Sequence, residues 1–250
     1  MNILLTNDDG INGAGLWAMA HTLKARGHEI IIAAPMTQQS GMSHALSVLR
    51  DIEYKRFDNP HCIAWTFDGT PTDCVKIYLE GMNPPKFDAL ISGINDGANL
   101  ATDVLYSGTV GAALEGFLHN IPSLAVSRSI YSEIPFDIVA EAVADYLEKI
   151  LSLKDEPFLH NLNFPKSFRA GKPEFLITRL GQRDYINAFT SRTDDTGKAY
   201  FRIGGTIYDT DAGEGTDIYA VNRGFVAVTP LKADTADYDE IVELRKLFRG

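Results

Sequence analysis

The chain has 250 residues, 45% of them hydrophobic, so it is long enough to bury one substantial core. Its 23 Lys and Arg residues are outnumbered by 33 Asp and Glu residues, and the net charge of -10 argues against binding to a nucleic-acid duplex. We find no apolar run close to the roughly 18 residues that span a bilayer, and the first residues lack the basic stretch and cleavage site typical of a leader, so we expect none. We therefore expect no membrane contact and a cytoplasmic location.

Strand and helix patterns alternate over the first 170 residues or so. Residues 2–6 indicate a strand, 13–26 a helix, and 29–34 a second buried strand after the stop signal Gly27. Two strand-like runs then flank Asn59-Pro60 and predict an inserted hairpin, at residues 52–57 and 63–67. Further buried strands are expected at 88–92, 124–127 and 158–163, and helices at 72–79, 110–119 and 136–151. The alternation predicts an α/β fold with a doubly wound, mostly parallel sheet.

The pattern changes after about residue 170. Antiparallel strands are indicated at 175–179, 199–208 and 225–229, and an amphipathic helix at 238–248. The segment 183–217 is too polar and Gly-rich to form its own core, so we expect a hairpin arm whose partner strands lie on another subunit. We predict one domain over residues 1–250. Its core covers about 1–170, and the arm and a C-terminal oligomerisation region cover about 171–250.

Short polar turns end several of the predicted strands or open a helix. In open α/β sheets ligands bind beyond the carboxyl ends of the strands, so we expect these turns to share one crevice. They are Asn7-Asp8-Asp9-Gly10, Gln39-Ser40-Gly41, Ser92-Gly93-Ile94-Asn95-Asp96-Gly97 and Tyr106-Ser107-Gly108-Thr109.

Asp8 and Asp9 are adjacent carboxylates that repel one another at the end of the first strand. They can converge only if the backbone leaves the strand there, which Gly10 permits. With Ser40 and Asn95 they form a set of hard oxygen donors that suits one Mg²⁺ or Mn²⁺ ion. The alternative is that one carboxylate caps the following helix and the other is solvated.

The Ser107-Gly108-Thr109 turn predicts a phosphate site. At a helix start it presents backbone N–H groups and the positive end of the helix to an anion. Gly41 is predicted as a further phosphate contact. The alternative for the Ser107 turn is a plain helix N-cap.

Three other features receive structural interpretations. Residues 13–18 match GxGxxA, but the two carboxylates lie where a dinucleotide pyrophosphate would bind. His44 lies near a site loop, and we expect a surface or supporting role rather than catalysis. Cys62 and Cys74 lack a metal-site spacing and are expected to be reduced thiols.

Motifs along nearly the whole chain resemble the stationary-phase survival protein SurE family, whose members are metal-dependent 5′-nucleotidases. They are NDDG at 7–10, APxxxxSG at 34–41, GTPTDCV at 69–75, SGINDGANL at 92–100, YSGTVGAALEG at 106–116, LNFP at 162–165, GTD at 215–217 and VTPL at 228–231. The resemblance implies a Rossmann-like core, a protruding β-hairpin used to form a homodimer or homotetramer, and hydrolysis of nucleoside monophosphates.

The same resemblance assigns residues by position. It implies that Asp8, Asp9, Ser40 and Asn95 hold the divalent ion and that Ser107, Gly108 and Thr109 contact the phosphate. The loop of the family often carries Asp and Arg where this chain has Thr37 and Gln38. A charge that can steer the substrate is therefore missing, which affects the expected affinity and preference.

The predicted reaction is hydrolysis of a phosphomonoester at the ion, with Asp8 and Asp9 as catalytic residues. Direct attack by one of these carboxylates to form an aspartyl-phosphate is the second route, and both stay open. Other classes considered are a phosphoacceptor receiver module and half of a sugar-nucleotide glycosyltransferase. A receiver needs a Lys after a late strand, where this chain has Arg128, and a glycosyltransferase needs a second similar domain.

Overall fold

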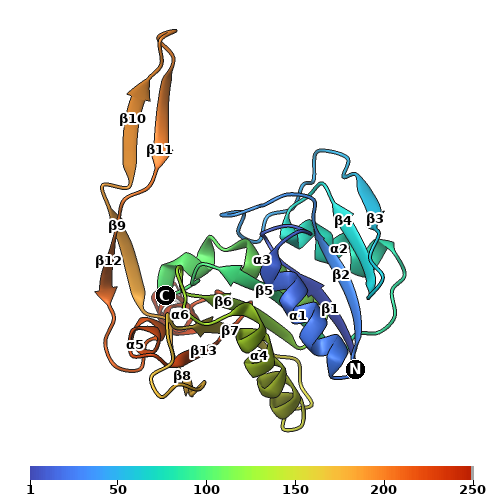
Figure 1. Cartoon of the computed structure of the whole chain (residues 1–250). Coiled ribbons are helices and arrows are strands. Elements are labelled where there is room, and N and C mark those ends of the chain that lie inside the picture. The colour runs from blue at the N-terminus through green and yellow to red at the C-terminus, as the bar shows by residue number, and fades with distance from the viewer. Residues whose placement is uncertain (249–250) are drawn as a thin grey trace.

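A nine-stranded sheet runs through the computed structural model, which describes residues 1–248 (Figure 1). From one edge to the other the strands are β3 (Tyr54–Phe57), β4 (Ile63–Phe67), β2 (Glu29–Pro35), β1 (Asn2–Thr6), β5 (Ala89–Asp96), β6 (Ser123–Arg128), β7 (Leu159–Phe164), β13 (Val226–Pro230) and β8 (Phe175–Ile177). The six strands from β4 to β7 are parallel, whereas β3 and β13 run antiparallel to their neighbours β4 and β7. The predicted doubly wound, mostly parallel sheet is confirmed.

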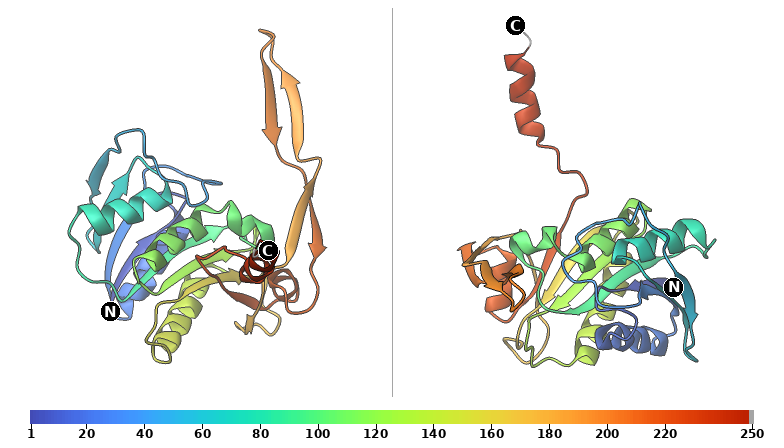
Figure 2. Two further views of the ribbon diagram at one scale, coloured as in Figure 1. Left: turned by 180° about the vertical axis from the view of Figure 1, so that it is seen from behind. Right: turned by 90° about the horizontal axis from the view of Figure 1, so that it is seen from above.

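Helices cover both faces of the sheet (Figures 1 and 2). The first face packs against α1 (Ala14–Ala25) and α4 (Phe136–Leu151), and the second against α2 (Pro71–Gly81) and α3 (Gly108–Leu118). Side chains alternate along β1, so Ile3 and Leu5 face the first layer and Leu4 the second. Because β1 is buried on both faces, its sequence is a continuous apolar run rather than an alternating one.

The predicted hairpin at 52–67 is present, but it is not an insertion. Its second strand, β4, pairs in parallel with β2 and is a regular member of the sheet, while β3 pairs antiparallel with β4 at the edge. Strand β5 also continues past its predicted end at Ser92, through a shift in its pairing with β6, and carries Asn95. Two short helices were not predicted: η1 (Ala101–Leu105) and α5 (Asp217–Asn222).

The segment after residue 180 forms a hairpin arm that projects from the body (Figure 1). The predicted strand at 199–208 divides at Gly204-Gly205 into β11 (Ala199–Ile203) and β12 (Thr206–Asp211). Their antiparallel partners are β10 (Phe189–Thr193) and β9 (Gln182–Ile186) of the same chain. The strand-like run therefore pairs within its own chain, and partner strands on another subunit stay a prediction. A tight turn at 194–197, with Gly197 at φ +83°, folds the chain back on itself.

The last helix, α6 (Tyr238–Leu247), stands clear of the sheet (Figure 2). Every residue in it is at least partly exposed, including the apolar Val242, Leu244 and Leu247. The predicted helix is confirmed, but it lies away from the core of its own chain. Within residues 1–248 no helix is long and apolar enough to cross a bilayer.

Candidate active site

The polar turns meet at the carboxyl ends of β1, β2 and β5. Gly10 takes φ +90°, so the chain leaves β1 directly after the acid pair. The backbone N–H of Gln39 donates to the carbonyl oxygen of Asp8 at 2.7 Å, which ties the second turn to the first. A Cβ at Gly108 would lie 3.2 Å from both Asp8 Cβ and Gln39 O, so a glycine is needed where α3 approaches. The predicted clustering of these turns is therefore present.

Asp8 is 4% exposed and accepts a 2.7 Å hydrogen bond at Oδ1 from Oγ1 of Thr109, in the first turn of α3. Burial raises its pKa to about 6; the hydrogen bond from Thr109 opposes that shift and the charge of Asp9 adds to it. Burial, followed by the charge of Asp96, also raises the pKa of Asp9. Among the ion pairs of residues 1–248, none includes Asp8 or Asp9. The fold thus holds adjacent carboxylates with no side-chain cation to balance them.

This donor set fits a divalent cation. Asn95 donates from Nδ2 to Gly97 O at 2.7 Å, which leaves its amide oxygen free to accept or to bind an ion. Ser40 is exposed, and its hydroxyl accepts from Gln38 Nε2 at 3.0 Å. Carboxylate, amide and hydroxyl oxygens are ligands that Mg²⁺ and Mn²⁺ take in proteins, and the positive charge would relieve the carboxylate repulsion.

The residues predicted to bind phosphate differ in what they can offer. Ser107 caps α3, because its Oγ accepts from Val110 N at 3.1 Å, and its hydroxyl hydrogen can still donate to a ligand. The hydroxyl of Thr109 is already engaged by Asp8. Gly41 is exposed at φ +75°, with open space around it. Ser107 and the start of α3 are therefore the best-placed donors for an anion.

Two glycines of the GxGxxA match have packing reasons. A Cβ at Gly13 would lie 2.6 Å from Asn7 Nδ2, and one at Gly15 would lie 2.1 Å from Ile94 O. Both glycines let α1 pack directly on the turn after β1 and on β5. This close packing agrees with a structural interpretation rather than a dinucleotide fingerprint.

The sequence patterns did not reveal a part-buried contact between His44 of the loop after β2 and Glu115 of α3. His44 Nε2 lies 2.7 Å from Oε2 of Glu115, a residue of α3 that is 3% exposed. The available signal was the acidic residue within the small-residue helix motif YSGTVGAALEG. Glu80, Glu115 and His119 also come within 4.8 Å of one another and could ligate a metal. Lys76, however, already lies 2.7 and 3.2 Å from the two glutamates and neutralises one of their two charges.

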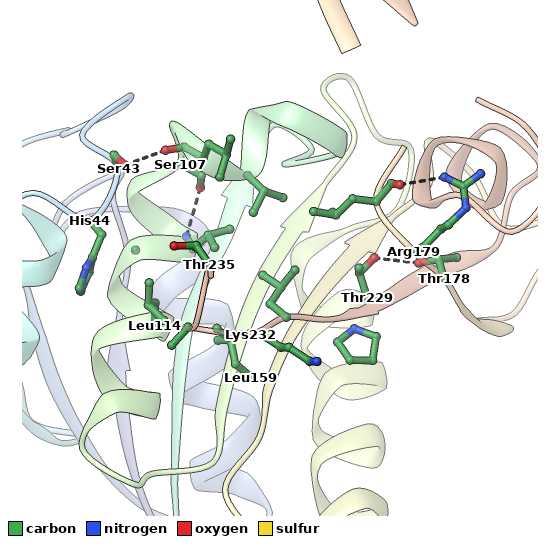
Figure 3. A pocket seen from close by; sticks show the side chains of 18 of the residues that line it. Ser43, His44, Ser107, Leu114, Leu159, Thr178, Arg179, Thr229, Lys232 and Thr235 are labelled. Atoms are coloured by element: carbon green, nitrogen blue, oxygen red, sulfur yellow. Dashed lines mark hydrogen bonds between the residues drawn. The ribbon is translucent and has the colours of Figure 1, made fainter. Parts of the chain in front are cut away.

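A groove of about 700 Å³ borders the site (Figure 3). Ser43, His44 and Ser107 line one end and Thr178 and Arg179 the other. Its floor includes Leu159 of β7, which belongs to the same apolar cluster as α2 and α3, and Thr229 of β13. The groove touches the site at Ser107 and not at the acid pair.

Comparison with known proteins decides the family. Residues 3–187 match the family model described as Survival protein SurE. The chain belongs to the SurE family. The 5′-nucleotidase SurE of Heliobacterium modesticaldum is 42% identical over 254 residues, covering 100% of this chain and 93% of that protein. That of Pelotomaculum thermopropionicum is 40% identical over 253 residues, covering 100% and 96%.

A solved SurE structure has the same fold. The crystal structure of the SurE protein from Aquifex aeolicus aligns with a TM-score of 0.82 and 34% identity, over 99% of each chain. The family resemblance and the α/β fold class read from the sequence are confirmed. The receiver and glycosyltransferase alternatives find no support in these relatives.

Proposed function

We propose that this SurE-family chain is a metal-dependent 5′-nucleotidase, which hydrolyses nucleoside 5′-monophosphates to nucleoside and phosphate. One observation carries the proposal: buried Asp8, next to Asp9, lies against the N-terminus of α3, and neither carboxylate forms an ion pair within residues 1–248. Such a site attracts a divalent ion on one side and a phosphate on the other. The relatives named 5′-nucleotidase SurE support the substrate class.

Asp8, Asp9, Asn95 and Ser40 are the residues that would hold one Mg²⁺ or Mn²⁺ ion per chain. When bound, such an ion polarises a phosphoryl oxygen and lowers the pKa of a coordinated water. Thr109 fixes the orientation of the Asp8 carboxylate through its 2.7 Å hydrogen bond. Ser107, the backbone at Gly108 and the positive end of α3 stabilise the negative charge on the phosphoryl oxygens. Gly41 lets the loop backbone approach the phosphate.

A second route to the same products is direct attack. Asp8 or Asp9 would displace the nucleoside from phosphorus, and water would then hydrolyse the aspartyl-phosphate. Borohydride trapping of the acyl phosphate during turnover separates the two routes, because only this one forms a reducible acyl group on the protein.

We also propose that the chain forms a single domain and works in the cytoplasm as a homodimer or homotetramer. Both cysteines are free thiols, which fits a reducing compartment. The arm supports assembly, because Phe189, Phe201 and Ile203 share one face of the β10–β11 ribbon and are 63%, 78% and 80% exposed. The exposed apolar residues of α6 offer a second surface.

The test is phosphate release from nucleoside 5′-monophosphates with added Mn²⁺ or Mg²⁺. Activity should be lost after chelator dialysis, return with the ion, and fall sharply in Asp9→Asn. Asp58→Asn is a matched control, because Asp58 is exposed on the turn between β3 and β4 and the change is chemically the same. Full activity after complete metal removal would refute the proposal.

A further inference from the structure

The loop that carries Ser40 and Gly41 has no helix or strand of its own. It belongs to the connection between β2 and β3, residues 36–53, and crosses the carboxyl end of the sheet. Its geometry must therefore come from contacts on either side of Ser40. On the N-terminal side that contact is the 2.7 Å hydrogen bond from Gln39 N to Asp8 O.

On the C-terminal side the loop lies directly on η1 and α3. Ser43 donates from its backbone N–H to Tyr106 O at 3.0 Å and from Oγ to Leu105 O at 2.6 Å. A Cβ at Gly111 would lie 2.3 Å from Ser43 O, so any larger residue there would push the loop off the helix. Figure 3 shows Ser43 beside Ser107, with His44 next along the loop.

The next residue, His44, contacts a buried carboxylate of α3. His44 Nε2 lies 2.7 Å from Glu115 Oε2, and Lys76 Nζ lies 3.2 Å from Oε1 of the same carboxylate. Burial opposes ionisation of Glu115, but the hydrogen bonds from His44 and Lys76 outweigh it and lower its pKa. A buried carboxylate that loses one of its partners is strongly destabilised, so Glu115 retains the His44 side chain.

We propose that His44 and Glu115 form a positioning pair: their hydrogen bond holds residues 39–44 on α3 and so sets Ser40 and Gly41 against Asp8 and Asp9. His44 is a positioning residue that acts through the loop and touches neither metal nor substrate. The inference rests on the metal site proposed above. It predicts that breaking the pair weakens metal binding even where the fold survives.

His119 provides a matched control within the chain. Its Nδ1 lies 2.9 Å from the backbone oxygen of Glu115 and 3.5 Å from Oε1 of the same carboxylate, but His119 follows α3 and is not part of the loop. If the network serves only general stability, loss of either histidine should affect the protein alike. If His44 positions the loop, only its loss should change the metal site.

The experiment measures the Mn²⁺ dissociation constant by electron paramagnetic resonance of free Mn²⁺, without substrate. His44→Ala should weaken binding about 10-fold or more, in the range seen when groups that orient metal ligands are removed. His44→Gln, whose amide can still donate to Glu115, should recover most of the loss, and His119→Ala should stay close to the unmodified protein. Hydrogen exchange at Gln39 N–H should accelerate in His44→Ala alone.

The outcomes separate this inference from the proposed function. Asp8→Asn, measured alongside, should abolish tight Mn²⁺ binding; if it does not, the metal site itself is wrong. If Asp8→Asn loses Mn²⁺ while His44→Ala binds it normally, or while His119→Ala loses as much, the positioning role is overturned. Should His44→Ala not fold, Glu115→Gln replaces it, and an unchanged Mn²⁺ dissociation constant in that variant would overturn the role as well.

Discussion

The hydroxyl of Thr109 donates a 2.7 Å hydrogen bond to Oδ1 of Asp8, which joins the first turn of α3 to the end of β1. Thr109 is fully buried and Asp8 is 4% exposed, so water cannot readily replace this bond. The bond selects one orientation of the carboxylate and favours its charged form. The hydroxyl of Thr109, a residue predicted to contact phosphate, is therefore engaged by Asp8.

The substitution Thr109→Val tests what this hydrogen bond does for the pKa of Asp8 and for metal affinity. Valine keeps the shape of the side chain but removes the donor, so the pKa of Asp8 should rise further and Mn²⁺ affinity should fall by about 10- to 100-fold. Thr109→Ser restores the hydroxyl and should recover most of the affinity. Isothermal titration with Mn²⁺ measures both. Equal affinities for the valine and serine variants would show that the hydroxyl has no influence on the site.

Substitutions in the acid pair should lower activity without lowering stability. Asp8→Asn and Asp9→Asn should each lower kcat by well over about 100-fold, because a charged ligand is lost. Since the pKa of buried Asp8 is raised to about 6, its charge at pH 7 is unfavourable without metal, and Asp8→Asn should melt at the same or a higher temperature. Asn95→Ala, which removes a neutral oxygen, should have a smaller effect. Melting curves with and without Mn²⁺ test this, and lower melting temperatures with a normal metal response would leave the pair as a structural cap.

Ser107 has both a structural and a binding role to test. Ser107→Ala removes the N-cap of α3 and should lower the free energy of unfolding by about 0.5 to 2 kcal/mol. It should also raise KM for nucleoside monophosphates if the hydroxyl binds ground and transition states alike. Thr216→Ala, which removes the N-cap of α5, should lower stability without changing KM. Denaturant unfolding and steady-state kinetics on both variants distinguish the roles; an unchanged KM in Ser107→Ala leaves only the cap.

We expect the buried His160 to make the folded protein less stable in acid. The His160 ring stacks on Phe158, and its Nδ1 lies 2.8 Å from the hydroxyl of Tyr146. Burial, with a smaller contribution from the charge of Lys154, lowers the pKa of His160 from 6.5 to about 4. The unfolded chain then binds a proton more readily than the folded one. The stabilisation is therefore full above pH 6.5 and is lost as the pH falls toward 4, by up to about 3 kcal/mol.

Urea unfolding between pH 4.5 and 7.5 measures this slope. His160→Gln should flatten it, whereas His21→Gln, a change at an exposed histidine, should leave it as in the unmodified protein. Parallel slopes in all three proteins would show that other groups cause the acid sensitivity.

We expect a charge on the apolar face of the arm to disturb assembly and a charge on its opposite face to leave assembly intact. Phe201→Glu places a charge on the apolar face that Phe201 shares with Phe189 and Ile203, and should shift the protein toward monomer at micromolar concentration. Thr190→Glu lies in the same ribbon on the opposite face and should leave the assembly intact. Light scattering measures the mass. An unmodified protein that is already monomeric would refute the assembly proposal.

The long elements were predictable because each buries a continuous or periodic apolar surface of its own. The run Ile3-Leu4-Leu5 could only be a strand between two layers, and α4 shows its buried stripe plainly. The arm strands β9 and β10 were missed because they bury almost nothing and depend on pairing with β12 and β11. The parallel pairing of β4 with β2 was missed for a related reason, since a strand's sequence does not encode the direction of its neighbour.

The family, the parallel sheet and the acid pair could be predicted from the sequence, because they follow from apolar periodicity and from short motifs at strand ends. Which side chains meet depends on the packing of the folded chain. Asp8 and Thr109 are 101 positions apart, and His44 and Glu115 are 71 apart. Whether a hydroxyl or imidazole reaches a given carboxylate depends on how closely α3 approaches the loops. Small residues such as Gly108 and Gly111 permit this close approach. Differences of a few tenths of an ångström in such distances come from packing the whole chain, and no local pattern of residues specifies them.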